Sequence, residues 1–69
     1  MDNIEIMLNG IRRVIPRGID LEGLLDRFEL PKMRVAIEVN KMVVRRPHWP
    51  DTKLSENDTI EIVHFVGGG

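Results

Sequence analysis

The residues with the clearest potential for chemistry are three consecutive glycines, 67–69, at the end of the sequence. They follow directly on a run of strand-forming residues, 59–66. Glycine has no Cβ, so such a segment can adopt any φ region and leaves the α-carboxylate of Gly69 unshielded. We therefore expect one folded domain over 1–66 and a flexible glycine tail over 67–69 that presents this carboxylate. The alternative is a frayed terminus without a function.

Length and composition exclude several other kinds of site. A chain of 69 residues and 8.0 kDa is one domain, and a domain this small hides only about 60% of its unfolded surface. There is no cysteine, which rules out a disulfide and a thiolate metal site. The two histidines, His48 and His64, are far apart and lack ligand spacing, so we expect no metal. Aliphatic packing must hold the fold together.

Charge and hydropathy narrow the choice of partners. A net charge of -1 provides no general attraction to nucleic acid or to an anionic membrane. Two phenylalanines and one tryptophan are too few for a base-stacking platform. No apolar run approaches the roughly 18 residues of a membrane span, and no signal-peptide pattern opens the sequence. We expect a cytoplasmic protein without nucleic-acid or membrane partners.

The first part of the sequence reads as a β-hairpin. Ile4, Ile6 and Leu8 alternate with less apolar neighbours, the period of a strand with one buried face. Asn9-Gly10 is a dipeptide that tolerates the positive φ angles of a two-residue turn. A return strand is then expected over 11–15.

A helix is expected next. Asp20 can act as its N-cap by accepting hydrogen bonds from the first turn. Gly23 lowers helix propensity by about 1 kcal/mol relative to alanine, and close approach to the sheet would explain it. Leu30-Pro31 should stop the helix, since a residue before proline avoids the α region. Four apolar residues form one continuous stripe on this helix: Leu21, Leu24, Leu25 and Phe28.

The second half reads mainly as strands. The expected elements are a strand over 35–39, a turn at 40–41, a short strand over 42–44, an irregular segment over 47–50, a turn at 57–58 and a last strand over 59–66. Trp49 should fill the edge of the core from the irregular segment. Only one helix is visible, so its apolar stripe must cover one face of a single sheet.

These elements indicate an α+β fold. The last strand can pair in parallel with the first, which places both in the middle of a mixed four- to five-stranded sheet. With one main helix packed on one face, this is the β-grasp, or ubiquitin-like, architecture. A split α+β arrangement with ferredoxin-like topology is the main alternative, but the presence of only one helix argues against it.

Three stretches carry a resemblance to a known family: VAIEVN at 35–40, VVRR at 43–46 and NDTIEIVHFVGGG at 57–69. Together with Trp49 they resemble the sulfur carrier protein of thiamine (thiazole) biosynthesis, over nearly the whole chain. The sequence departs from that family at Arg45, where proline is common, and at Asn57-Asp58, where Gly-Asp is common. Neither departure touches the glycines.

The resemblance implies a protein co-substrate that is not itself an enzyme. An adenylylating (E1-like) activating enzyme would use ATP to adenylylate the carboxylate of Gly69. A sulfur donor such as a cysteine desulfurase relay would then leave a thiocarboxylate, and thiazole synthase would receive the sulfur. Gly68 would let the tail thread into these enzymes. No cofactor is expected to bind the carrier itself, because ATP is used by its partner.

Strand alternation predicts a docking surface for these partners. If Ile60 and Ile62 face the helix, Val63 and Phe65 point out of the other side of the sheet. Met7 and Ala36 should lie on that side too, because their neighbours Ile6 and Ile37 are expected to point inward. Exposed apolar residues of this kind often mark partner sites. The alternative is that they merely cover the open face. The expected partner-binding residues are Val63, Phe65, Met7, Ala36 and Gly67.

The remaining polar residues indicate less. His64 should lie on the inward side at the end of its strand, as an edge histidine rather than a proton shuttle, because no orienting partner is identifiable. Arg12-Arg13 and Arg45-Arg46 could meet an acidic patch on a partner or could simply be solvated.

Other functions remain open at this point. The small subunit of molybdopterin synthase has similar chemistry but usually has prolines shortly before its glycines, and residues 64–66 contain none. A ubiquitin-like protein modifier or a non-catalytic interaction module with incidental glycines are further alternatives. An independent enzyme has least support, because no nucleophile–base pair, phosphate loop or metal cluster is visible.

Overall fold

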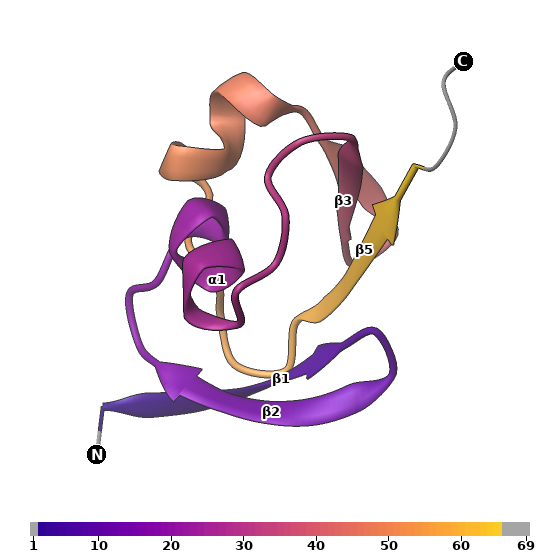
Figure 1. Ribbon diagram of the computed structural model, residues 1–69. Helices are drawn as coiled ribbons and strands as arrows, with labels where there is room; N and C mark the ends of the chain where they lie inside the picture. The colour runs from indigo at the N-terminus through magenta and orange to yellow at the C-terminus, as the bar shows by residue number, and fades with distance from the viewer. Residues whose placement is uncertain (1, 66–69) are drawn as a thin grey trace.

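The computed structural model describes residues 2–65 and confirms the expected architecture (Figure 1). A mixed five-stranded sheet has the strand order β2-β1-β5-β3-β4, and one α-helix covers one of its faces. β5 lies in the centre, parallel to β1 and antiparallel to β3. The elements are β1 (Asn3–Leu8), β2 (Ile11–Pro16), α1 (Leu21–Arg27), β3 (Val35–Val39), β4 (Met42–Val44), the 3-10 helix η1 (Arg46–Asp51) and β5 (Thr59–His64). The predicted glycine tail and Val66 lie outside the described residues.

The opening hairpin forms as its sequence predicts. β1 and β2 are antiparallel, with Ile4 opposite Ile15 and Leu8 opposite Ile11. Between them Asn9 and Gly10 both have positive φ, 50° and 82°, which matches the right-handed twist of the two strands.

α1 begins at the predicted cap. The Asp20 carboxylate accepts a hydrogen bond from the backbone N–H of Gly23 at 2.8 Å. The prediction that Gly23 allows a close approach of the helix to the sheet is wrong. A Cβ there would come within 3.2 Å of the Ile19 side chain, so the crowding comes from the segment before the helix and not from the sheet.

α1 ends earlier than predicted, at Arg27 rather than at Leu30-Pro31. Glu29 adopts a positive φ of 54°, and the N–H of Leu30 donates to the carbonyl of Leu25 over 2.8 Å. This is the Schellman closure of a helix, here with glutamate at the position that glycine usually occupies. The proline follows a helix that has already ended.

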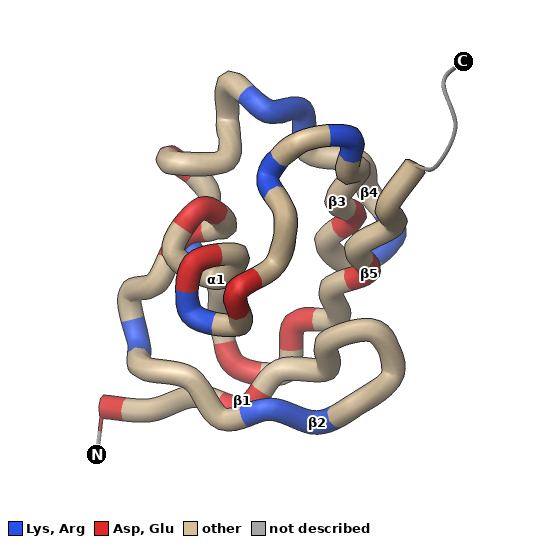
Figure 2. The backbone as a smooth tube through the Cα atoms, in the orientation of Figure 1, with Lys and Arg blue, Asp and Glu red and all other residues tan. Residues whose placement is uncertain are grey.

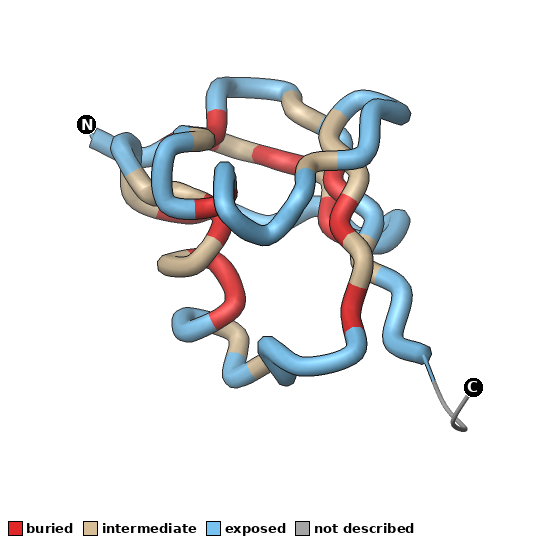
Figure 3. Tube along the Cα trace, turned by 90° about the horizontal axis from the view of Figure 1, so that it is seen from above, coloured by how far each residue is buried: buried red, intermediate tan, exposed pale blue. Residues whose placement is uncertain are grey.

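The core lies between α1 and the sheet (Figure 3). No polar or charged side chain among residues 2–65 is buried. Phe28, the last residue of the predicted helix stripe, is only partly buried and lies under the Arg13 guanidinium at 5.3 Å. The buried residues are Ile4, Ile6, Leu8, Ile15, Leu21, Leu24, Leu25, Val35, Ile37, Trp49, Leu54 and Ile60.

Trp49 fills the core edge as predicted, but the segment around it is regular. Residues Arg46–Asp51 form η1, which packs against α1. Trp49 is 2% exposed, and its indole N–H donates to the carbonyl of Val44 at 2.9 Å. The Arg46 guanidinium covers the ring at 4.5 Å. The aromatic residue therefore buries its apolar body while its one polar atom is satisfied.

Candidate functional site

β3 sets the direction in which the chain leaves the domain. It pairs with β5 along five residues, from Val39↔Ile60 to Val35↔His64. The N–H of Phe65 then donates to the carbonyl of Arg34 at 2.7 Å, so the pairing continues to the last described residue. Gly67, Gly68 and Gly69, the predicted reactive segment, lie outside the described residues.

The predicted docking residues are placed unequally around this point. Ile60 is buried and Ile62 half-buried on the helix side, whereas Val63 and Phe65 are 54% and 52% exposed. Ala36 is half-buried directly opposite Val63 in the register of β3 and β5. These three residues form what we call the tail-side patch: Ala36, Val63 and Phe65.

Met7 is not part of the tail-side patch. It is half-buried and stands opposite Thr59, four residues before Val63 along β5. At about 3.3 Å per residue this is a separation of roughly 13 Å, and Glu61 intervenes on the same face. Sequence alternation assigned Met7 to the correct face, but only the register of β1 and β5 shows where along that face it lies.

The loop before β3 and the start of η1 carry four cations, and Figure 2 shows Lys and Arg positions along both segments: Lys32, Arg34, Arg45 and Arg46. The Arg46 guanidinium donates to the carbonyl of Lys32, which joins the loop before β3 to the start of η1. Lys32 also forms an ion pair with Asp26 at 2.7 Å. The hydrogen bond that the Lys32 ammonium donates to the Asp26 carboxylate raises the pKa of Lys32 above its ordinary value of 10.5. No ion pair within 2–65 engages the three arginines.

Sequence reasoning treated both arginine pairs alike, and the structure separates them. Arg12 forms an ion pair with Glu5 at 2.9 Å, and Arg13 covers Phe28. Arg45 and Arg46 instead lie at the start of η1, where Arg46 covers Trp49 and donates to the carbonyl of Lys32. Arg34 was missed because its role depends on a backbone contact with Phe65, for which the sequence gives no signal.

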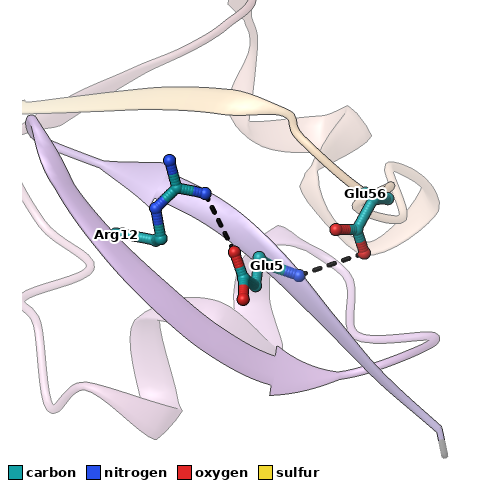
Figure 4. A network of polar contacts seen from close by, with 3 residues as sticks. All are labelled: Glu5, Arg12 and Glu56. Atoms are coloured by element: carbon teal, nitrogen blue, oxygen red, sulfur yellow. Dashed lines mark hydrogen bonds and ion pairs between the residues drawn. The ribbon is translucent and has the colours of Figure 1, made fainter.

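A second polar network fixes the beginning of β5 (Figure 4). The Glu5 backbone N–H donates to the carboxylate of Glu56 at 3.2 Å, beside the ion pair with Arg12. The Glu5 carbonyl accepts from the N–H of Asn57 at 2.7 Å. The turn before β5 is thereby tied to β1, as it must be for β5 to run parallel to it.

Other kinds of site find no support in the described part of the chain. No three His, Asp or Glu side chains within 2–65 lie where they could hold a metal ion. None of the helices described there is long and apolar enough to cross a membrane. His64 is exposed and stands opposite the buried Val35 at the end of the ladder.

The sheet order and single covering helix define a β-grasp protein. The crystal structure of the thiamine biosynthesis protein ThiS from Geobacter metallireducens has the same fold, with a TM-score of 0.84 over 96% of this chain and 100% of that one, at 23% sequence identity. The model of the ThiS family matches residues 6–69. The chain belongs to the ThiS family.

Two curated relatives are closer in sequence. The sulfur carrier protein ThiS of Bacillus subtilis is 39% identical over 49 residues, which cover 71% of this chain and 74% of that protein. The thiazole synthase of Magnetococcus marinus is 44% identical over 66 residues, 96% of this chain. The chain spans only 20% of the length of that synthase.

Proposed function

We propose that this protein is the sulfur carrier of thiamine thiazole biosynthesis and that the carboxylate of Gly69 carries the sulfur. The observation that carries the proposal is the match of residues 6–69, glycines included, to the ThiS family. The names of the Bacillus and Magnetococcus relatives support the pathway. The protein then acts as a co-substrate, and its partners perform the catalysis.

The chemistry follows from the weakness of a carboxylate as an electrophile. An activating enzyme transfers AMP from ATP to the carboxylate of Gly69 and releases pyrophosphate. A sulfur nucleophile attacks the resulting acyl-adenylate, AMP leaves, and a thiocarboxylate remains. Thiazole synthase takes the sulfur and returns the carboxylate. The lack of a Cβ at each glycine keeps the activated carbonyl accessible and lets the segment enter a narrow tunnel.

Docking of the folded body must offset the ordering of the tail. Fixing three glycines costs on the order of 3–6 kcal/mol in conformational entropy. Val63 and Phe65 are each about half exposed, so completing their burial contributes roughly 2–3 kcal/mol together. Ala36, Gly67 and, farther away, Met7 would add smaller contacts. The burial of these two side chains at most reaches the lower limit of that cost, so further contacts are needed.

The test is intact mass spectrometry. Incubation with the activating enzyme, ATP and hydrosulfide should exchange one oxygen for one sulfur atom, and fragmentation should place the sulfur on Gly69. Deletion of Gly69 should abolish this exchange while leaving the urea midpoint unchanged. Sulfur loading of the deletion variant would contradict the proposal.

A further inference from the structure

β5 has a free backbone edge where it leaves the sheet. β1 pairs with it only through Met7↔Thr59 and Leu8↔Ile60. The chain of β1 then turns back at Asn9-Gly10 into β2, whereas β5 continues to His64 (Figure 1). Among residues 2–65, β5 from Ile62 onward has a neighbouring strand on the β3 side only.

The hydrogen-bonding groups on that edge follow from the ladder. The Phe65 N–H points to β3, where it donates to Arg34, and Val63 is opposite Ala36 in the same pattern. Because the direction of backbone groups alternates along a strand, Ile62 and His64 direct theirs to the opposite side.

Asn9 marks where the free edge begins. Its N–H donates to the carbonyl of Ile60 at 2.9 Å, and its side-chain oxygen accepts from the N–H of Ile62 at 2.7 Å. Beyond it, three groups in succession have no partner among residues 2–65: the carbonyl of Ile62, then the N–H and the carbonyl of His64.

This edge lacks the usual protection against strand pairing. Natural sheet edges are protected from pairing with other strands by devices such as lysine or proline side chains, and residues 62–65 contain neither. On the face away from the helix, the same stretch presents the exposed Val63 and Phe65. An alternating series of acceptor, donor and acceptor beside apolar side chains is complementary to another extended backbone.

We propose that an extended segment of thiazole synthase adds to this edge as a sixth strand when the glycine tail enters that enzyme. The inference rests on the proposed function and names how the same site is recognised. The incoming segment should be apolar on the side that lies beside Val63 and Phe65. The synthase is the favoured occupant because the edge leads directly into the glycines, and because the Magnetococcus synthase contains a region similar to this chain within its own polypeptide.

A second copy of the chain fits less well. Antiparallel pairing of two copies through the same three groups would place His64 opposite His64. It would then place residue 68 of each copy opposite residue 60 of the other. Such a dimer would occupy the glycines that the proposed function requires.

The test exchanges His64 for proline and for alanine. His64→Pro removes the outward N–H, and proline is tolerated at an edge whose N–H faces solvent. His64→Ala removes the imidazole and keeps the N–H. Both variants should retain the urea midpoint to within a small shift. The dissociation constant for thiazole synthase should rise at least about tenfold in His64→Pro, or about 1.4 kcal/mol, and stay within about twofold in His64→Ala. Equal affinities for the two variants would overturn the proposal.

Amide hydrogen exchange of the unsubstituted protein provides a second readout. The His64 amide should exchange rapidly in the free carrier and slowly in its complex with the synthase, whereas the Phe65 amide, already bonded to Arg34, should be protected in both. If sulfur is transferred but the exchange of the His64 amide is unchanged in the complex, the strand addition is overturned and the proposed function stands. If the carrier neither binds the synthase nor transfers sulfur to it, the proposed function is overturned as well. A dimer of the carrier that His64→Pro dissociates would reassign the edge to a second copy.

Discussion

The side-chain oxygen of Asn9 accepts a hydrogen bond from the backbone N–H of Ile62 across 2.7 Å, which joins residues 53 positions apart. The same asparagine holds the positive φ of the hairpin turn, and its own N–H donates to the carbonyl of Ile60. One residue therefore completes the β1–β2 turn and extends the short pairing of β1 with β5 by one further hydrogen bond.

Substitution of Asn9 should separate these two roles. Asn9→Gly keeps the positive φ but removes the acceptor, and we expect it to lower the free energy of unfolding by about 1 kcal/mol. Asn9→Asp keeps an acceptor oxygen and should lower it by less. Urea unfolding followed by circular dichroism measures both. If the two variants lose the same stability, the side-chain hydrogen bond contributes nothing.

Trp49 should be the most sensitive position of the core. Trp49→Ala is expected to cost about 3–5 kcal/mol, a large part of the roughly 3–10 kcal/mol available to a domain of this size. The variant should be largely unfolded by far-ultraviolet circular dichroism at 25 °C. Arg46→Ala removes the cation over the ring and the hydrogen bond to the carbonyl of Lys32, and should cost less, about 1–2 kcal/mol. A folded Trp49→Ala protein would show that the indole is not needed to close the core.

The parts of the fold that the sequence predicted correctly depend on local patterns. Alternation of Ile4, Ile6 and Leu8 identifies β1, and Asn9-Gly10 identifies the hairpin turn, because both signals lie within a few residues. The N-cap Asp20 likewise accepts its hydrogen bond from a residue only three positions later, Gly23. Such contacts leave a signature in the spacing of residue types.

The parts that were missed depend on contacts between distant segments or on unusual local conformations. Glutamate at a helix-ending position with positive φ carries no composition signal, so Glu29 was not recognised as the end of α1. The distance of Met7 from Val63 and the contact of Arg34 with Phe65 are set by the register of strands far apart in sequence. The free edge beyond Ile62 exists because β1 pairs with β5 through Met7 and Leu8 and then turns back at Asn9-Gly10.

The Lys32–Asp26 pair should make a small contribution to stability that disappears at high pH. The pKa of Lys32 is raised in the folded protein by the hydrogen bond with Asp26, above an ordinary value of 10.5. A group whose pKa is higher in the folded state stabilises the folded protein fully at pH values below its unfolded-state pKa. This stabilisation is lost as the pH rises through the folded-state pKa. The difference in urea midpoint between the unsubstituted protein and Asp26→Asn should therefore shrink as pH rises beyond about 10.5.

An NMR titration of the Lys32 side chain provides the direct measurement for this pair. Its pKa should fall in Asp26→Asn, because the hydrogen bond that favours the charged form is gone. An unchanged Lys32 titration would mean that the pair does not persist in solution.

Val63 and Val14 allow a matched test of the tail-side patch, since both are 54% exposed valines on strands. Val14 lies on β2 at the far edge of the sheet, whereas Val63 is on β5 next to Phe65. Replacement of either by serine should change the unfolding free energy equally, by no more than about 0.5–1 kcal/mol.

Val63→Ser should slow sulfur loading and weaken binding to thiazole synthase by about three- to tenfold, because the burial that offsets tail ordering is reduced. Val14→Ser should load at the original rate. If both variants load at the original rate, Val63 is not part of the docking surface. If both load equally slowly, the effect belongs to the sheet as a whole.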